Sequence, residues 1–279
     1  MWKKLKAVLE LSRADHALLT AIAIIASYYY LTGSFSIPLE LILVPVLLQL
    51  SVFIVNDIWD YRADLANNRV DRPLVRGDIS LFEAKLWGIV LGLIALLLGL
   101  WKLPFHLLVF VIGVGVLSFL YNYKLKEMPF VGNVVVAFTM VAPFIYTMLY
   151  VGVMDRFLLL FSYAILFFGI AREIIKSIED MEGDKKERKA LTLPILVGIK
   201  EAKKIALVFW GIYLVLLAYL LLIAPEKLLL GAIFLGALYI AKEIWEIENS
   251  AQASKIKKHM LYLMFLGVLV LFLFKPFSL

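Results

Sequence analysis

Nine long apolar windows constrain the fold of this chain more than any other feature. They lie at residues 15–32, 39–61, 83–101, 104–122, 130–150, 157–180, 203–223, 228–246 and 258–275. Each is close to the ~20 residues that an α-helix needs to cross the hydrocarbon core of a bilayer. Hydrophobic residues make up 63% of the chain, above the roughly 45–50% of a soluble globular protein. We therefore predict an all-α integral membrane protein, with nine transmembrane helices in a single domain over residues 1–279.

The basic residues are distributed unevenly around these windows. With nine spans, one side of the membrane holds every Lys and Arg except Lys102, Arg156, Lys227 and Lys275. The positive-inside rule assigns the basic side to the cytoplasm. This predicts a multi-pass protein of the cell membrane whose N-terminus and polar stretches lie on the cytoplasmic side. The first residues, MWKKLKAVLELSRADH, predict a basic amphipathic helix at the membrane interface and no cleavable signal peptide.

Two polar stretches interrupt the apolar pattern, at residues 56–80 and 172–204. Each follows an even-numbered span, and four spans separate them, which predicts two four-helix halves plus a ninth helix. Functional sites often lie between such repeats. The chain has no cysteine, which excludes disulfides and thiolate catalysis, and its three histidines are scattered, so no zinc site is expected. The lipid bilayer is the expected environment, and no nucleic-acid partner is expected.

The first polar stretch opens with a row of oxygen ligands. Asn56, Asp60 and Asp64 are spaced four residues apart, so on a helix they share one face with about 5–6 Å between neighbours. Mg²⁺ prefers oxygen and commonly binds one or two carboxylates together with substrate phosphates. Asp57 is rotated about 100° off this row, and we interpret it as a supporting residue that fixes a ligand or a basic side chain. The alternative is a solvated acidic helix end.

The second polar stretch combines basic and acidic side chains on one stripe. Arg172, Lys176, Asp180 and Asp184 step by four, so a metal at the end of the stripe and a phosphate further in are both possible ligands. The alternative is i,i+4 ion pairing within the helix, which is worth only ~0.2–0.5 kcal/mol. Two such acidic rows facing each other would bind divalent cations, and the cations would bind a diphosphate.

Two connecting segments add basic residues. Arg69, Arg72 and Arg76 lie beside three carboxylates, and they either neutralise these acids or grip a diphosphate. Pro73 and Gly77 favour a loop there. In a short turn after the fourth span, Lys124 and Lys126 lie beside Tyr121 and Tyr123. This turn is either an aromatic belt with snorkelling lysines or a further diphosphate contact.

The paired acidic strings resemble the UbiA superfamily of membrane prenyltransferases. Asn56 to Asp64 is similar to the family pattern NDxxDxxxD, and Asp180 to Asp184 is similar to DxxxD. The resemblance covers essentially the whole chain. It implies a nine-helix bundle around a central cavity and Mg²⁺-dependent transfer from an isoprenyl diphosphate. In that case Asn56, Asp60 and Asp64 hold one Mg²⁺, and Asp180 and Asp184 hold the other.

The resemblance also implies which residues act on the substrate. The four aspartates of the two rows are the expected catalytic residues: Asp60, Asp64, Asp180 and Asp184. The expected substrate-binding residues are led by Arg72, Lys176 and one of Lys124 and Lys126, and they include Arg69, Arg172, Tyr121 and Asp57.

The context of the second row is more particular. The stretch AREIIKSIEDMEGDKKERKALTLPILVG is similar to an archaeal subfamily that makes ether lipids. That similarity implies geranylgeranyl diphosphate as donor and geranylgeranylglyceryl phosphate as a lipid-like acceptor, in phospholipid biosynthesis. Prenylation of an aromatic acceptor, 4-hydroxybenzoate or a naphthoate, is the alternative because such enzymes share the main motifs.

Two other function classes fit the sequence less well. CDP-alcohol phosphotransferases carry a DGxxAR block, which this chain does not have. Cation transporters usually bind their ions near the middle of the membrane, whereas both acidic rows lie at predicted span ends.

Overall fold

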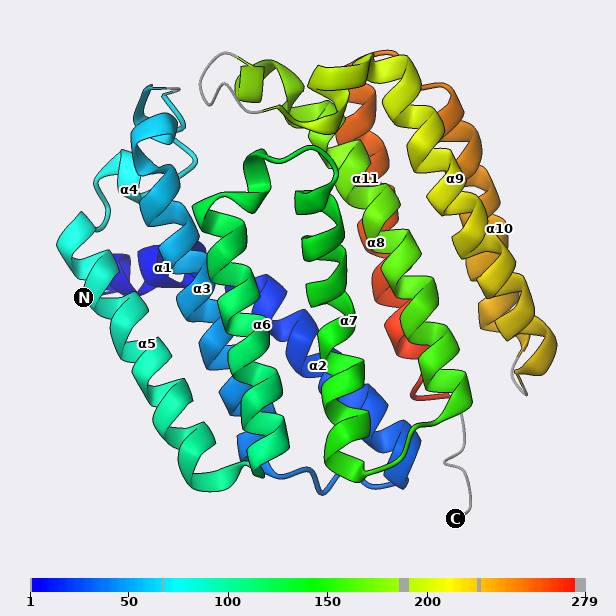
Figure 1. Cartoon of the computed structure of the whole chain (residues 1–279), viewed down its shortest axis with the longest axis horizontal. Helices are drawn as coiled ribbons and strands as arrows, with labels where there is room; N and C mark the ends of the chain where they lie inside the picture. Colours follow the sequence, from blue (N-terminus) through cyan, green and yellow to red (C-terminus); the bar gives the residue numbers. More distant parts are fainter. Residues whose placement is uncertain (1, 67, 186–190, 225–226, 274–279) are drawn as a thin grey trace. The chain divides into compact units, whose positions relative to one another are not determined.

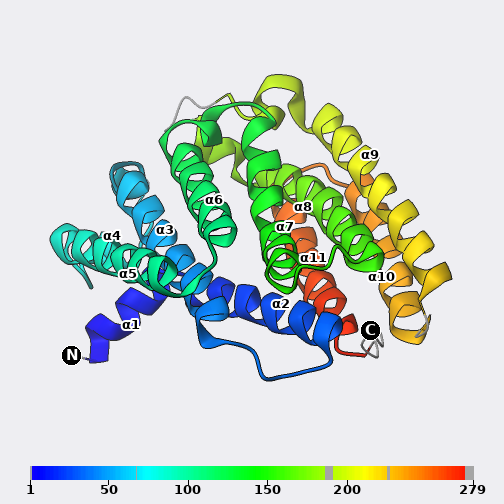
Figure 2. The same ribbon diagram turned by 60° about the horizontal axis from the view of Figure 1, so that its bottom comes forward.

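The structure is a computed structural model that describes residues 2–66, 68–185, 191–224 and 227–273. Within these residues every regular element is a helix (Figures 1 and 2). The chain divides into two compact units, which are described separately below. Unit 1 comprises Met1–Ile24 and Ser36–Tyr123, and unit 2 comprises Ile25–Phe35 and Lys124–Leu279. The division after Tyr123 coincides with the predicted division between the first four spans and the rest.

Unit 1 is built on α3. Its elements are α1 (Trp2–Leu11), the first part of α2 (Ala14–Thr32), α3 (Leu39–Ala66), α4 (Pro73–Arg76), α5 (Leu81–Lys102) and α6 (Phe105–Tyr123). Helices α3 and α5 lie side by side in both ribbon views. Ser51 of α3 donates a hydrogen bond to the Gly88 carbonyl of α5 at 2.7 Å, and a Cβ on Gly92 would lie only 3.0 Å from the Ser51 hydroxyl. Small residues therefore allow this close helix packing.

Unit 2 is built on α8. Its elements are the second part of α2, η1 (Leu125–Glu127), α7 (Val131–Val151), α8 (Arg156–Gly183), α9 (Leu193–Ile223), α10 (Lys227–Trp245) and α11 (Ser250–Val270). Helix α8 packs against α7, α9 and α11. The close α7–α8 contact depends on Gly169, because a Cβ there would lie 3.1 Å from the Ala137 backbone. Trp210 of α9 donates a hydrogen bond to the Ala237 carbonyl of α10 at 2.9 Å.

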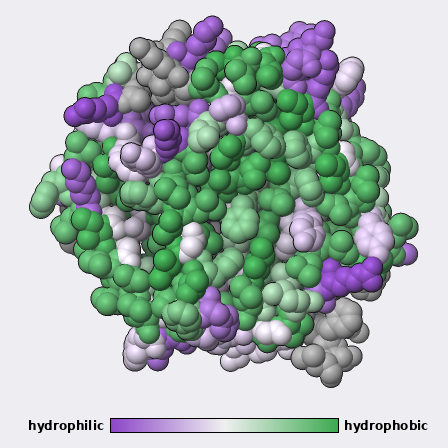
Figure 3. Space-filling model, in the orientation of Figure 1, coloured by the Kyte–Doolittle hydropathy of each residue, from purple (hydrophilic) through white to green (hydrophobic). Residues whose placement is uncertain are grey.

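The apolar helices confirm an all-α membrane protein. Eight helices of the described chain, α2, α3 and α5 to α10, are long and apolar enough to span a bilayer, and the chain is a multi-pass membrane protein. Apolar side chains cover most of the face drawn in Figure 3. A helix also occupies the ninth predicted position, but α11 carries three lysines in its first nine residues. The predicted ninth window reaches residue 275, outside the described residues, so the count of nine stays a prediction.

The expected loop at Pro73 to Gly77 was wrong. Residues 73–76 form the one-turn helix α4, because Pro73 is well suited to a first helical turn. Gly77, at φ +72°, ends this helix, and its N–H donates to the Leu74 carbonyl. Helix α9 begins at Leu193, ten residues before the predicted span, with Pro194 in its first turn and non-helical backbone at Gly198.

The predicted amphipathic N-terminal helix is present as α1. Its buried face, Ala7, Val8 and Leu11, packs in an apolar cluster with Ile54 of α3 and Leu74 of α4. Ion pairs also join α1 to the segment around α4 and the start of α5. Lys3 pairs with Asp78 at 3.0 Å, Lys4 pairs with Glu83, and Glu10 pairs with Arg76. Protein therefore covers part of the apolar face of α1 that was expected to contact lipid.

Candidate active site

The first acidic row lies on the last turns of α3, in unit 1. The helix has 28 residues, more than the ~20 that a span needs, so these turns extend beyond the apolar segment. Asn56, Asp60 and Asp64 are on one helix at the predicted spacing, which places their side chains along one face. Asp64 is buried, at 6% exposure, whereas Asn56 and Asp60 are partly exposed.

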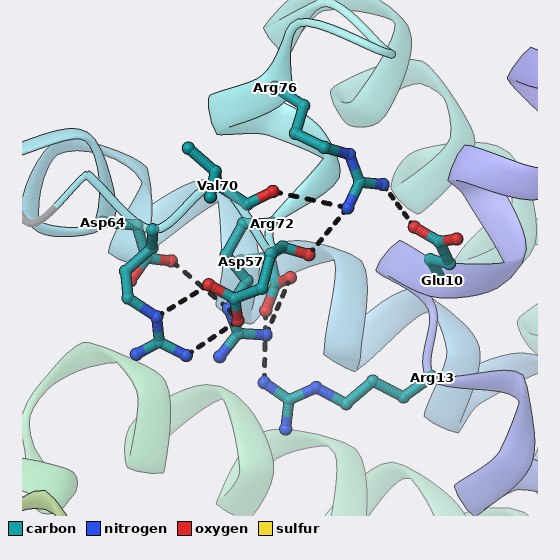
Figure 4. Close-up of polar contacts among 9 residues, drawn as sticks. Glu10, Arg13, Asp57, Asp64, Val70, Arg72 and Arg76 are labelled. Carbon is teal, nitrogen blue, oxygen red and sulfur yellow. Dashed lines mark hydrogen bonds and ion pairs between the residues drawn. The ribbon is translucent and has the colours of Figure 1, made fainter.

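Asp57 is not on this face, and its carboxylate accepts hydrogen bonds from two arginines. Arg13 donates to one oxygen at 3.2 Å and Arg72 donates to the other at 3.4 Å (Figure 4). Asp57 is only 3% exposed, so the arginines compensate for burying its charge. Arg13 lies between α1 and α2, where its guanidinium also stacks on the Phe53 ring at 4.9 Å. The contacts agree with the interpretation of Asp57 as a residue that fixes a basic side chain.

Arg72 lies beside the first acidic row. It precedes α4, and its Nε lies 3.8 Å from carboxylate oxygens of both Asp64 and Asp71, too far for a hydrogen bond. This Nε is buried and has no hydrogen-bond acceptor in the described part of the chain. Leaving a buried donor without an acceptor costs about 1–3 kcal/mol. The open donor position beside the acidic row therefore suits an anionic ligand.

The other two arginines of this segment neutralise neighbouring acids. Arg69 donates two hydrogen bonds of 2.9 Å to Asp71, which lowers the pKa of Asp71 to about 2. Arg76 donates to Asp78 at 2.7 Å, and the pKa of Asp78 is lowered by Arg76 and then by Lys3. The neutralising alternative thus describes both pairs, and a role of Arg69 in substrate binding stays a prediction.

The second acidic row lies at the end of α8, in unit 2. Asp184 caps this helix in αR conformation, and its N–H donates to the carbonyl of Asp180. The two side chains are therefore one helical turn apart, as predicted. Asp180 is exposed and Asp184 is partly buried. Between them and the apolar segment, Glu179 pairs with Lys257 of α11 at 2.5 Å, which ties the end of α8 to a neighbouring helix.

Glu173 is the residue of this region whose importance the sequence reasoning missed. It is 4% exposed, accepts a hydrogen bond from Arg172 at 2.5 Å and pairs with Lys176 at 3.7 Å. The sequence reasoning considered i,i+4 pairs along the stripe, whereas these contacts are i,i+1 and i,i+3. The Arg172 Nε is buried without a hydrogen-bond acceptor among the described residues. A carboxylate inside a long apolar span was the available signal.

The remaining predicted residues lie near the division between the units. Tyr121 is near the end of α6 in unit 1, and it is partly buried. Lys124 caps η1 and is exposed, whereas Lys126, within η1, is partly buried. The choice between the two lysines stays open.

The donor chemistry of both rows fits Mg²⁺. No three His, Asp or Glu side chains of the described chain are already gathered around a common point. Mg²⁺ does not require such a group, because it commonly binds one or two carboxylates and completes its shell with waters and substrate phosphates. Each unit supplies two aspartates one turn apart on a helix end, together with an arginine whose Nε has no acceptor among the described residues. Both halves are therefore suited to a metal-bound phosphate group.

Comparison with known proteins places the chain in a family. The model of the UbiA prenyltransferase family matches residues 17–269. The chain belongs to the UbiA prenyltransferase family. This match includes both acidic rows and all eight helices that qualify as spans except for the first residues of α2. The predicted resemblance is thereby confirmed.

Several proteins with similar sequences or structures indicate which members of the UbiA family this chain resembles. Digeranylgeranylglyceryl phosphate synthase of Archaeoglobus fulgidus is 38% identical over 214 residues, covering 74% of this chain and 71% of the relative. A solved structure described as digeranylgeranylglyceryl phosphate synthase in membranes has a TM-score of 0.75 at 27% identity, covering 97% of this chain and 98% of that one. A UbiA homolog from Archaeoglobus fulgidus, bound to GPP and Mg²⁺, shares the fold at TM-score 0.67 and 19% identity, over 95% and 99% of the two chains.

Proposed function

We propose that this chain transfers a geranylgeranyl group from geranylgeranyl diphosphate to the free hydroxyl of geranylgeranylglyceryl phosphate, forming an archaeal ether lipid. The relative of 38% identity that carries the name of this activity is the observation that supports the proposal most strongly. The alternative, an aromatic acceptor for quinone biosynthesis, has no comparable support from the relatives.

The arrangement of each unit supports an isoprenyl diphosphate as the donor. Asp60 and Asp64 in unit 1, and Asp180 and Asp184 in unit 2, supply hard oxygen ligands, with Asn56 as a fifth. Mg²⁺ held by these rows would neutralise the charge that develops on a leaving diphosphate. The homolog bound to GPP and Mg²⁺ has the same fold, which supports this combination of metal and substrate class for the present chain.

The reaction breaks one carbon–oxygen bond and forms another. The bond between C1 of the prenyl group and its diphosphate oxygen breaks, and the diphosphate leaves with the electron pair. The acceptor oxygen then bonds to C1 and gives up its proton to the released diphosphate, and an ether results. In this proposal each unit offers an arginine as an N–H donor to phosphate oxygens, Arg72 in unit 1 and Arg172 in unit 2, and Lys176 adds a further positive charge in unit 2. An apolar environment protects the allylic cation from water.

The side of the membrane is also part of the proposal. Basic residues are concentrated in the segments that follow α3 and α8, including Arg69, Arg72 and Arg76. The positive-inside rule therefore favours the cytoplasm for the N-terminus and both acidic rows. Labelling of single cysteines introduced at Lys6 and at Leu228 in intact cells should modify only the second with an impermeant reagent. The reverse pattern would contradict the orientation.

A direct assay tests the activity. Purified protein with Mg²⁺, geranylgeranyl diphosphate and geranylgeranylglyceryl phosphate should release diphosphate and yield the diether, identified by mass spectrometry. Chelation of the metal should stop the reaction. Absence of the diether together with prenylation of 4-hydroxybenzoate or a naphthoate would assign the chain to the aromatic-acceptor enzymes instead.

A further inference from the structure

We infer that Glu173 is a positioning residue, which holds Arg172 and Lys176 ready for the diphosphate of the donor. The inference rests on the proposed function, since it assigns a role within the same site. It concerns a residue that belongs to neither acidic row. Glu173 acts through the two cations, and no contact between Glu173 and the substrate is required.

The two carboxylate oxygens of Glu173 contact different basic side chains. Arg172 Nη1 donates to Oε1 at 2.5 Å, and Lys176 Nζ lies 3.7 Å from Oε2. The Glu173 side chain is only 5% exposed, whereas that of Lys176 is 38% exposed. The carboxylate is thus fixed inside the protein, and the ammonium group that it attracts remains accessible. Such an arrangement restricts a long side chain that otherwise has many rotamers.

Arg172 adds the second observation. Its Nη1 is engaged with Glu173, but its Nε is buried and has no hydrogen-bond acceptor in the described residues. Guanidinium groups bind phosphate through parallel N–H donors, so a fixed group with an open donor is prepared for an anion. An ion pair that served only stability would leave no such donor, because a buried donor without an acceptor is costly.

Unit 1 contains the same combination around Asp57. That carboxylate is also buried, and each of its two oxygens faces a different arginine. Its partner Arg72 also has a buried Nε, which finds no hydrogen-bond acceptor in the part of the chain that the structure describes. The two carboxylates come from different helices, and their partners have unrelated positions in sequence. A repeated arrangement in each unit indicates that each buried carboxylate serves the ligand of the acidic row in its own unit.

The test is binding of inorganic pyrophosphate with Mg²⁺ to the full chain in detergent, measured by calorimetry. Glu173→Gln keeps the shape of the side chain and removes its charge. We expect the Kd for pyrophosphate to rise about tenfold, the effect of losing one hydrogen bond to a charged group. Glu173→Asp, which keeps the charge, should recover part of the affinity. In the Lys176→Gln background, Glu173→Gln should have a smaller effect than in the wild type.

Glu243→Gln is the matched control. Glu243 is also buried in unit 2, at 9% exposure, and pairs with two basic partners, Lys255 at 3.6 Å and His259 at 2.7 Å. It lies outside both acidic rows, so this variant should bind pyrophosphate like the wild type. Equal affinity of folded Glu173→Gln and wild type would overturn the inference, and so would equal weakening by Glu243→Gln.

Folding and function are separated by two further measurements. If Glu173→Gln loses its cooperative thermal transition, pyrophosphate binding is measured on Lys176→Gln and Arg172→Gln instead. Normal pyrophosphate affinity in both of these variants would overturn the inference. Because binding is measured without an acceptor, it does not depend on the identity of the acceptor. Wild-type protein that binds pyrophosphate but makes no diether would contradict the proposed function and leave the role of Glu173 supported.

Discussion

In both units a buried carboxylate holds two basic side chains near an acidic row, but the two units hold these side chains through different contacts. In unit 1 the buried Asp57 gathers Arg13 from between α1 and α2 and Arg72 from the segment before α4, partners that are 44 and 15 residues away. In unit 2 the buried Glu173 gathers Arg172 and Lys176 from its own helix. Cations beside the first row therefore depend on the docking of separate elements, whereas those beside the second row depend mainly on one helix.

This difference predicts which substitutions should displace the basic side chains of each unit. A helix fixes the spacing of Arg172, Glu173 and Lys176 by its geometry alone. Arg13 and Arg72 keep their positions only while α1 and the segment of α4 stay docked. The apolar cluster that contains Leu11, Ile54 and Leu74 maintains that docking. Unit 1 should consequently respond to changes far from its acidic row, and unit 2 should respond mainly to changes on α8.

The largest effect is expected where the units are alike. Asp60→Ala and Asp180→Ala each remove an oxygen ligand from one row, and a metal supplies several kcal/mol of charge stabilisation in a transition state. We expect kcat/KM to fall at least about a hundredfold in each variant, with a normal thermal transition. Diether formation and Mg²⁺ titration measure the effect. Full activity of either variant would remove its row from the proposed site.

The next effect tests Arg72 and Arg172, whose Nε atoms have no acceptor within the described ranges. Arg72→Lys and Arg172→Lys keep the positive charge but remove the planar set of donors. We expect the KM for geranylgeranyl diphosphate to rise about tenfold in each. The loss should be greater for Arg72, which also lies 3.8 Å from Asp64. Arg156→Lys, on the opposite end of α8 and exposed, is the control and should have an unchanged KM. Unchanged KM in both test variants would show that charge alone is sufficient.

A smaller effect, on the rate of proteolysis, should distinguish the role of Asp57 from that of Glu173. Asp57→Asn removes the charge that joins the α1–α2 junction to the segment before α4, so that segment should open more often. Hydrogen bonds to charged groups contribute about 1.5–3 kcal/mol, which predicts trypsin cleavage at Arg69 or Arg76 about tenfold faster or more. Glu173→Gln should leave this cleavage rate unchanged. Equal acceleration in both variants would contradict the division of roles between the units.

The sequence predicted the local parts of this comparison and missed the long-range ones. Apolar windows located eight spanning helices within about five residues, except at the start of α9, which begins ten residues earlier than predicted, because bilayer thickness imposes the length of a span. Helical periodicity placed each acidic row on one face. The partnership of Arg13 with Asp57 depends on docking over 44 residues, which no local pattern encodes. Glu173 was missed for a different reason, since only i,i+4 pairs were considered, whereas its partners are Arg172 at i−1 and Lys176 at i+3.

The smallest effect concerns the ion pairs that surround α1. Lys3 pairs with Asp78 and Lys4 with Glu83, and both lysine side chains are largely exposed, at 81% and 64%. Exposed pairs contribute about 0–1 kcal/mol and are screened by salt. The double variant Lys3→Ala with Lys4→Ala should therefore keep its activity within about twofold. Its small loss of stability relative to the wild type should disappear in high salt.

Leu11→Ala, which truncates a fully buried side chain, should instead destabilise unit 1 by about 2–5 kcal/mol. It should also accelerate cleavage at Arg69 or Arg76 at any salt concentration. If the lysine variant accelerated cleavage more than Leu11→Ala, charge rather than apolar packing would be what keeps α1 docked beside the first acidic row.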